Sequence, residues 1–419
     1  MATTTKIYVY ADWVGLKQAT LMGELTATYV RGTEVFSFEY TADWIQSGQS
    51  QDLDPSLQFY LGPQFNNAAY KPNFGIFLDS SPDRWGRLLM KRREAILARK
   101  EYRKPRVLVE SDFLLGVYDE YRVGGLRFKT DLETAFLSAE KWLASLPWTN
   151  LRELEQASLA LEKEDMGDDE TLKWLNMLMA PGSSLGGARP KASVKDPNEN
   201  LWIAKFPSGK DEHDVGAWEK VALQIASDAG ISVYPTMVRK FSGKHHTFLS
   251  KRFDRTDSGD RIHFASAMTL LGYNDGTDHH DGVSYIELAE HLIQHGSNVN
   301  EDLKELWKRI VLNICIKNTD DHLRNHGFLL TDSGWRLSPL YDVNPFPEGM
   351  GLTLNISEDD NSLNLNLALS VSGYFRLKEQ EAKKIIEQIK VSVLKWRKFA
   401  DELKISRAEQ SRMSGAFSD

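Results

Sequence analysis

The stretch NTDDHLRN, from Asn318 to Asn325, contains residue types that phosphoryl transfer requires. Asp320 stands five residues before Asn325, and a second carboxylate, Asp342, follows a predicted hairpin. In phosphoryl transfer, one carboxylate orients or deprotonates the attacking hydroxyl, while an amide oxygen and another carboxylate hold Mg²⁺ against the nucleotide phosphates. We therefore predict that Asp320 is the base or orienter and that Asn325 and Asp342 are magnesium ligands.

The flanks of this stretch support the prediction. The spacing of Asp320 and Asn325 is that of a protein-kinase catalytic loop. Residues from about 301 to 317 carry apolar side chains at helical spacing, which predicts a buried helix. Residues 328–330 and 335–337 predict two strands around a turn, which would return Asp342 to the neighbourhood of Asp320. A polar turn with a helix-capping Asp is the alternative, because one short motif arises easily by chance.

The Gly-rich stretch PGSSLGGARPK, residues 181–191, is the second informative segment. Small residues let backbone amides approach phosphate oxygens. Predicted strands at 192–194 and 201–205 follow, and the second ends in Lys205, which is the arrangement of a kinase nucleotide lobe. We predict that Lys205 binds the α- and β-phosphates, with a plain hairpin as the alternative. The residues predicted to cover the phosphates are Gly186, Gly187, Ala188, Arg189, Pro190 and Lys191.

Other segments define the rest of the chain more coarsely. Strands are predicted at residues 7–12, 21–29 and 34–40, and a mostly helical region at 111–160, apart from a strand-like segment at 125–128. The acidic run at 162–170 predicts a boundary or an exposed loop. Residues 377–403 predict a core-facing helical segment before a polar tail. His279, His280 and Asp281 come with no Cys and no second spaced His pair, so zinc is not expected there.

Composition limits the classes of protein that the chain can belong to. Its 419 residues are 41% hydrophobic and 26% charged, which is ordinary for a globular protein of two or three domains. The formal net charge of -8 predicts weak binding to nucleic acid. One cysteine excludes a disulfide framework and indicates the reducing cytoplasm. No apolar run approaches the length of a membrane-spanning helix, about 20 residues.

Taken in order, the motifs resemble those of the HipA family of bacterial serine/threonine kinase toxins. The resemblance is carried by SLGGARPK at 184–191, IAK at 203–205, SKRFDR at 250–255, TDDHLRN at 319–325 and PLYDV at 339–343. In the first half, SPDRWG at 81–86 and RVGGLRF at 122–128 also fit. The resemblance therefore covers nearly the whole chain, and its C-terminal motifs are specific as an ordered set.

This resemblance implies an α+β, two-lobed protein-kinase-like (HipA-like) fold with an N-terminal β-rich subdomain and a mainly helical C-terminal lobe. The corresponding domains are an N-terminal region at 1–170 and a kinase core at 171–419, divided near residue 255 into a nucleotide lobe and a catalytic lobe. ATP and Mg²⁺ are the implied cofactors. The implied partners are a protein substrate, with aminoacyl-tRNA synthetases known for the family, and a small helix-turn-helix antitoxin that contacts DNA.

The resemblance also implies roles for further residues. Lys251, Arg252 and Phe253 would contact the adenine, and His322 and Tyr341 would complete the nucleotide site. Autophosphorylation of Ser184 in the Gly-rich loop would switch the enzyme off. This chain departs from the family in two ways: Arg189 stands where many members carry Gln, and Ser183 beside Ser184 leaves the phosphorylated position open by one residue.

Two alternatives remain from other functional classes. The chain could be a catalytically weak kinase-fold scaffold in a repressor complex, or a kinase-fold enzyme that acts on a lipid or small molecule. For either a toxin or a scaffold, the net charge of -8 and the lack of a DNA-reading motif predict that the antitoxin supplies the base contacts.

Overall fold

The computed structural model describes residues 3–49, 51–137, 150–163, 167–179, 187, 189–241 and 243–417. The chain forms two compact units, which are described separately below. The first unit is Met1–Gly209 with Asp254–Ala265, and the second is Lys210–Phe253 with Ser266–Asp419. The sequence predicted domains at 1–170 and 171–419. These bounds differ from those of the two compact units, and the predicted domains stay a prediction.

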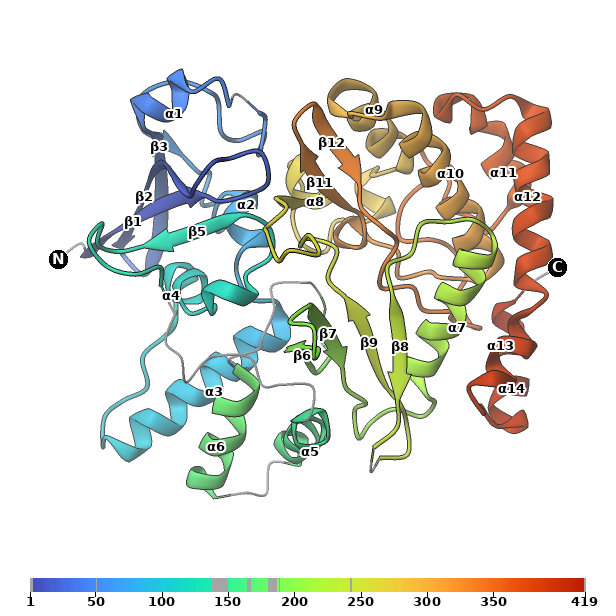
Figure 1. Ribbon diagram of the computed structural model, residues 1–419, viewed down its shortest axis with the longest axis horizontal. Helices are drawn as coiled ribbons and strands as arrows, with labels where there is room; N and C mark the ends of the chain where they lie inside the picture. Colours follow the sequence, from blue (N-terminus) through green and yellow to red (C-terminus); the bar gives the residue numbers. More distant parts are fainter. Residues whose placement is uncertain are drawn as a thin grey trace. The chain divides into compact units, whose positions relative to one another are not determined.

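A five-stranded antiparallel sheet organises the N-terminal part of the first unit (Figure 1). Its strand order is β4-β3-β2-β1-β5. The strands are β1 (Thr3–Ala11), β2 (Thr20–Val30), β3 (Thr33–Tyr40), β4 (Gln64–Phe65) and β5 (Leu126–Lys129). Alternate residues of β1 (Ile7, Val9 and Ala11) are fully buried, as expected for a strand with one face on the core. The three strands predicted between residues 7 and 40 are confirmed.

Helices make up most of the remaining first unit. They are α1 (Ala42–Gln46), α2 (Gly75–Asp79), α3 (Arg84–Lys100), α4 (Glu110–Leu115), the 3-10 turn η1 (Asp119–Tyr121), α5 (Leu151–Glu162) and α6 (Asp168–Met179). Both α3 and α5 pack against α6. Asp83 caps α3, since its Oδ1 accepts a hydrogen bond from the Gly86 amide at 2.8 Å.

Two predictions about this region were wrong. The described part of residues 111–160 is not mostly helical, because between α4 and α5 it holds only η1, β5 and loops, whereas the strand-like segment predicted at 125–128 is confirmed as β5. Gly124, with φ +71°, is one residue there whose backbone conformation breaks a helix. The acidic run is also not a loop throughout, because α6 begins at Asp168. Asp168, Asp169 and Glu170 occupy its first turn, where the helix dipole favours negative charge.

A hairpin of β6 (Lys191–Lys195) and β7 (Leu201–Lys205) follows α6 in the first unit, as the sequence predicted. Its register places Lys191 directly opposite Lys205. Like charges opposite one another destabilise a strand pair. Asp83 offsets this repulsion, because its Oδ2 lies 2.7 Å from the Lys191 ammonium and both side chains are 2% exposed.

Substitution of Asp83 by asparagine should destabilise the protein strongly. Asparagine is as good a helix cap as aspartate, so the change removes the charge and keeps the cap of α3. Loss of one partner of a buried ion pair costs about 3 to 5 kcal/mol in the free energy of unfolding. Thermal unfolding should therefore begin several degrees lower.

The matched control for this substitution is Asp168→Asn, which breaks an exposed ion pair with Arg99 at the other end of α3. Exposed pairs contribute little, so this variant should unfold close to the unmodified protein. Equal unfolding temperatures for the two variants would show that burial of the Asp83–Lys191 pair has no energetic consequence.

The second unit is mainly helical (Figure 1). Its helices are α7 (Val215–Asp228), α8 (Ala267–Leu270), α9 (Tyr285–His295), α10 (Val299–Cys315), α11 (Leu365–Ser370), α12 (Glu379–Val393), α13 (Trp396–Glu402) and α14 (Arg407–Met413). Its 3-10 turns are η4 (His279–Asp281), η5 (Leu323–Asn325), η6 (Ser372–Phe375) and η7 (Ser414–Ala416). Its hairpins pair β8 (Thr236–Arg239) with β9 (Thr247–Lys251) and β11 (Gly327–Thr331) with β12 (Gly334–Leu337). Along the chain, the division between the two units falls within the short strand β10 (Phe264–Ser266).

Helix α10 is the centre of the second unit, with α9, α11 and α12 packed against it. The predicted helix and the predicted hairpin after it are confirmed within two residues. Lys317, with φ +48°, then turns the chain out of the helix, and the Asn318 amide bonds back to the Asn313 carbonyl at 2.9 Å. The polar tail predicted after residue 403 was wrong, because α14 forms there and buries Met413.

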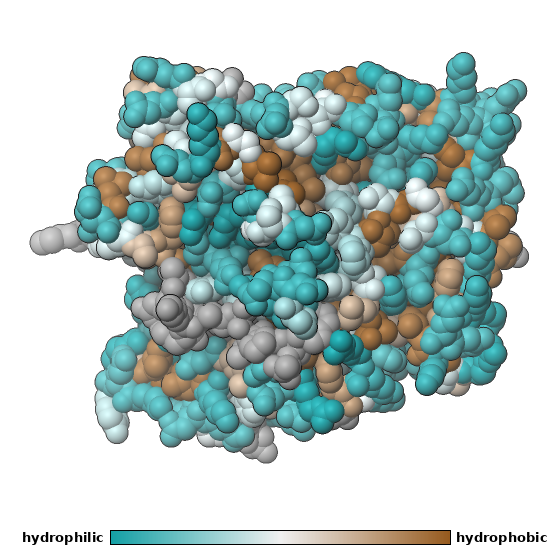
Figure 2. Space-filling view, viewed as in Figure 1, coloured by the Kyte–Doolittle hydropathy of each residue, from teal (hydrophilic) through white to brown (hydrophobic). Residues whose placement is uncertain are grey.

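The face of the molecule in Figure 2 carries hydrophobic residues scattered among hydrophilic ones.

In the part of the chain that the structure describes, no helix is both long enough and apolar enough to span a bilayer.

Candidate active site

The loop after α10 is built around the backbone of Asp320. Its carbonyl accepts hydrogen bonds from the His322 amide at 3.0 Å and from Asn325 Nδ2 at 3.0 Å. The Asn325 amide in turn donates to the His322 carbonyl at 2.8 Å. Since the nitrogen of the Asn325 side chain is committed to the loop, its oxygen is the atom available to a cation.

Asp342 lies just beyond β12, and its backbone is in the left-handed region with φ +55°. Aspartate and asparagine tolerate this conformation better than most residues, and such outliers cluster at functional sites. The neighbouring Tyr341 donates its hydroxyl hydrogen bond to the Arg324 carbonyl at 2.7 Å. The segment that carries Asp342 is thereby tied to the loop that carries Asp320 and Asn325.

Burial and the charges around Asp320 make its carboxyl a weaker acid than usual. Partial burial among neighbouring atoms raises the pKa of Asp320 most, the His322 imidazole opposes that rise, and the negative charges of Asp342 and Asp321 add to it. The structure therefore brings the predicted base and a predicted magnesium ligand within electrostatic reach of each other. A cation held by Asp342 would relieve this repulsion.

The raised pKa of Asp320 predicts the acid limb of the pH–rate profile. Only the ionised carboxylate can take the proton of the attacking hydroxyl, so the rate rises with pH as Asp320 ionises. The midpoint of the kcat/KM limb should lie above about 3.9, the ordinary value for Asp. His322→Gln removes a group that lowers the pKa, so this variant should move the limb to higher pH. The limb is measured from initial rates of phosphate transfer at a series of pH values. If the limb has the same midpoint in His322→Gln as in the unmodified protein, His322 does not influence the ionisation of Asp320.

Two buried polar atoms beside the site lack a hydrogen-bond partner within the described ranges. They are His322 Nδ1 and Asn344 Oδ1. Unsatisfied buried polar atoms are costly, and a bound ligand can satisfy them. The carboxylate of Asp342 and the amide oxygen of Asn325 are the hard oxygen donors that Mg²⁺ prefers. The donor set and the unsatisfied atoms thus fit a magnesium-bound nucleotide.

The predicted adenine contacts at residues 251–253 begin at the last residue of β9, in the same unit. The Phe253 ring lies 5.4 Å from the Tyr341 ring and 6.3 Å from the Tyr234 ring, measured between centroids. Arg252 is almost fully buried, whereas Lys251 is half-buried. Phe253 and Tyr341, two predicted nucleotide contacts, are therefore packed together, and their roles at the nucleotide stay a prediction.

The remaining predicted residues belong to the first unit. Gly187 has φ +95°, and a Cβ added there would stand 3.0 Å from the Lys191 ammonium, so both features favour glycine. Lys191 contacts Asp83. Lys205 lies opposite Lys191 in the strand pair, at the end of β7. Arg189 and Pro190 precede β6. The predicted residues Ser183, Ser184, Gly186 and Ala188 lie outside the described residues.

Sequence reasoning missed a buried polar cluster behind the loop. Asp321, 1% exposed, accepts hydrogen bonds at its Oδ2 from Tyr285 Oη at 2.6 Å, Asn313 Nδ2 at 2.7 Å and His326 Nε2 at 2.8 Å. These partners are also buried. The available signal was Asn313, a polar residue on the apolar face of the predicted helix.

Among the residues that the structure describes, one group outside this site has metal-binding geometry. Ligand atoms of His279 and His280 on η4 and of Asp278, which caps η4, lie within 4.8 Å of one another. Clusters with acidic groups are common without an ion, so the prediction that zinc does not bind there stays a prediction.

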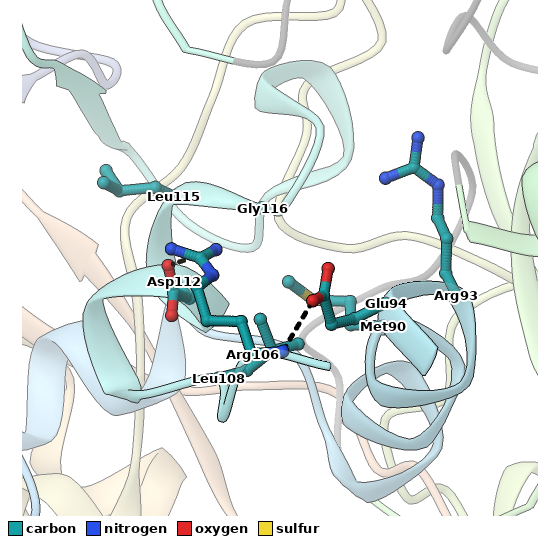
Figure 3. A pocket seen from close by; sticks show the side chains of 8 residues that line it. All are labelled: Met90, Arg93, Glu94, Arg106, Leu108, Asp112, Leu115 and Gly116. Carbon is teal, nitrogen blue, oxygen red and sulfur yellow. Dashed lines mark hydrogen bonds and ion pairs between the residues drawn. The ribbon is translucent and has the colours of Figure 1, made fainter. Parts of the chain in front are cut away.

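A cavity of about 300 Å³ lies in the first unit between α3 and α4 (Figure 3). Its lining residues are Met90, Arg93, Glu94, Arg106, Leu108, Asp112, Leu115 and Gly116. The Arg106 guanidinium lies 2.9 Å from Asp112, and the Arg106 amide donates to Glu94 at 2.7 Å. Both carboxylates of this cavity, Glu94 and Asp112, are thus already engaged by groups of the chain.

Comparison with solved structures defines the class of fold. HipA of Shewanella oneidensis MR-1, solved with HipB and its operator DNA, superposes with a TM-score of 0.64 at 18% identity. The match covers 98% of this chain and 94% of that chain. The fold is therefore the kinase-like α+β fold of HipA, as the sequence predicted.

Sequence comparison defines the family. Residues 183–396 match the family model described as the HipA-like C-terminal domain. The chain belongs to the HipA family, as its motifs predicted.

Two curated relatives are more limited matches. The Haemophilus influenzae protein named "Putative kinase" is 28% identical over 194 residues, which are 41% of this chain and 56% of that protein. "Putative kinase Y4mE" of Sinorhizobium fredii is 27% identical over 147 residues, 34% of this chain and 33% of that protein. The matches thus span about half and one third of the relatives' lengths.

Proposed function

We propose that the chain is an ATP-dependent serine/threonine protein kinase and the toxin of a HipA-type toxin–antitoxin system. The observation that carries this proposal is the arrangement of Asp320, Asn325 and Asp342 in one unit. One loop positions the base and the amide ligand, and the Tyr341 hydrogen bond ties the second carboxylate to that loop. Family membership and the names of the two relatives support kinase chemistry.

Each residue has a stated role in this proposal. Asp320 orients the substrate hydroxyl and accepts its proton as the phosphoryl group is transferred. Asn325 and Asp342 hold Mg²⁺, which when bound neutralises charge on the nucleotide phosphates. Lys205 holds the α- and β-phosphates, and residues 186–191 cover them. Phe253 and Tyr341 offer aromatic surface to the adenine.

The proposed partners follow from the family and from charge. The related HipA was solved with HipB and operator DNA. This chain carries a net charge of -8, so we propose that a small basic antitoxin contacts the DNA and holds the kinase indirectly. The protein substrate would be an aminoacyl-tRNA synthetase in the cytoplasm. Self-phosphorylation at Ser184, or at Ser183, would place about -1.5 to -2 charges beside the nucleotide phosphates and so inhibit the kinase.

Incubation of the purified chain with γ-labelled ATP and Mg²⁺ tests the proposal. Mass spectrometry should find phosphate on Ser184 or Ser183, and a fresh protein lysate should contain a labelled protein. Label that enters only lipids or small molecules would replace the protein-kinase proposal with a different kinase. No transfer to any acceptor, together with ATP binding, would favour the scaffold.

A further inference from the structure

A chain of buried hydrogen bonds connects Asp321 to the segment that carries Asp342. Asn313 Nδ2 donates to Asp321 at 2.7 Å, and Asn318 Nδ2 donates to Asn313 Oδ1 at 3.0 Å. Asn318 Oδ1 accepts from the Asn344 backbone amide at 3.1 Å. Asn344 stands two residues after Asp342, and Asp321 stands one residue after Asp320. The chain of bonds therefore runs from beside one predicted functional carboxylate to beside the other.

The direction of every bond in this chain is fixed by its two ends. A backbone amide can only donate, so Asn318 must turn its oxygen to Asn344 and its nitrogen to Asn313. An ionised carboxylate can only accept, so Asn313 must turn its nitrogen to Asp321. All three bonds thus point toward Asp321. Aligned hydrogen bonds polarise one another, and an anion at the end strengthens the row.

Asp321 has the properties that an anchor of this chain requires. Burial by itself raises the pKa of the Asp321 carboxyl. His326 opposes this through its charge and its hydrogen bond, and Tyr285 does so through its hydrogen bond. The net result is a pKa below the ordinary value for Asp. Asp321 is therefore ionised at neutral pH. Burial and the Asp321 charge raise the pKa of Tyr285 well above 10, so its hydroxyl stays a donor. Tyr285 connects the anchor to α9, and Asn313 connects it to α10.

We propose that Asp321, Tyr285, Asn313 and Asn318 are positioning residues that set the distance between the base Asp320 and the magnesium ligand Asp342. The proposal rests on the proposed function and adds residues that do not touch the substrate. Asp321 holds the Asp320 loop to α9 through Tyr285 and to α10 through Asn313. The side-chain amides of Asn313 and Asn318 connect the Asp342 segment to Asp321 as well. Without these hydrogen bonds, the carboxylates of Asp320 and Asp342 keep their chemistry but lose their alignment with each other.

Tyr285→Phe is the mildest test, because it removes one donor to Asp321 and keeps the buried ring. We expect kcat for phosphate transfer to fall about tenfold, the size of one hydrogen bond to a charged group, with the KM for ATP unchanged. The matched control is Tyr273→Phe. It removes a hydroxyl that bonds Glu287 at 3.0 Å, also on α9 but outside this chain of bonds. The control should keep kcat.

Asn313→Leu cuts the row of amides between Asp321 and Asn318 at nearly constant volume. Besides a lower kcat, this variant should need a higher Mg²⁺ concentration for half-maximal rate, because the Asp342 segment is released. Hydrogen exchange of residues 341–346 should be faster than in the unmodified protein and in Tyr273→Phe. A purely structural role would lower the unfolding temperature and leave kcat, corrected for folded protein, as it was.

Hydrogen exchange also separates this inference from the proposed function. If the unmodified protein transfers no phosphate, the proposed function fails, and faster exchange at 341–346 in Asn313→Leu still supports the positioning network. Unchanged exchange at 341–346, or unchanged kcat in both variants of an active enzyme, overturns it.

Discussion

Asparagine in place of Asp320 should lower the rate of phosphoryl transfer about a thousandfold, in the range of general-base catalysis. The carbonyl that accepts hydrogen bonds from Asn325 and from the His322 amide belongs to the backbone, so the loop should keep its shape. The substitution removes only the charge and basicity presented to the hydroxyl. Initial rates of phosphate incorporation should therefore collapse, while calorimetry should find ATP affinity nearly unchanged.

The control for this substitution is Asp332→Asn, at the exposed turn between β11 and β12. It removes a carboxylate of the same type from the same region and should leave the rate unchanged. Retention of self-phosphorylation by Asp320→Asn would show that another group accepts the proton. Equal loss of ATP affinity and rate would instead place Asp320 at the nucleotide.

Asparagine in place of Asp342 should weaken magnesium-dependent nucleotide binding at least about 100-fold. Loss of residues that only support a metal ligand already costs about 10- to 100-fold in metal affinity, and Asp342 is proposed as a ligand itself. Asparagine tolerates φ +55°, so the substitution adds little backbone strain. ATP titrations at several Mg²⁺ concentrations should show the loss, and titrations in a chelator should show no difference.

Asp359→Asn, an exposed substitution outside the site, is the control for Asp342→Asn. It should bind ATP as the unmodified protein does at every Mg²⁺ concentration. If Asp342→Asn keeps full affinity at low Mg²⁺, the metal ligands have been assigned wrongly.

Local sequence patterns were sufficient to predict the elements that carry the site. The apolar period of α10 is strong because one face of this helix packs against α9, α11 and α12. The strands β11 and β12 are short, but a Gly-containing turn marks the hairpin. The spacing from Asp320 to Asn325 identified the loop because the Asn325 side chain bonds to the backbone carbonyl of Asp320, five residues away.

The support behind the loop could not be predicted because it depends on distant residues. Asp321 is adjacent to Asp320, and nothing local shows which carboxylate is buried. Its partner Tyr285 is 36 residues away, and Asp83 is 108 residues from Lys191. Such pairs form only after helices and strands pack together. The spacing of residues along a single sequence therefore does not predict them.

The Asp83–Lys191 ion pair limits how the chain could be divided in evolution. The segment that the family model covers begins at residue 183, after Asp83 but before Lys191. A gene fusion or truncation that carried this segment alone would move a buried ammonium away from its carboxylate. We therefore expect the HipA-like segment of this chain to lose stability when it is separated from Asp83, the cap of α3 that contacts Lys191.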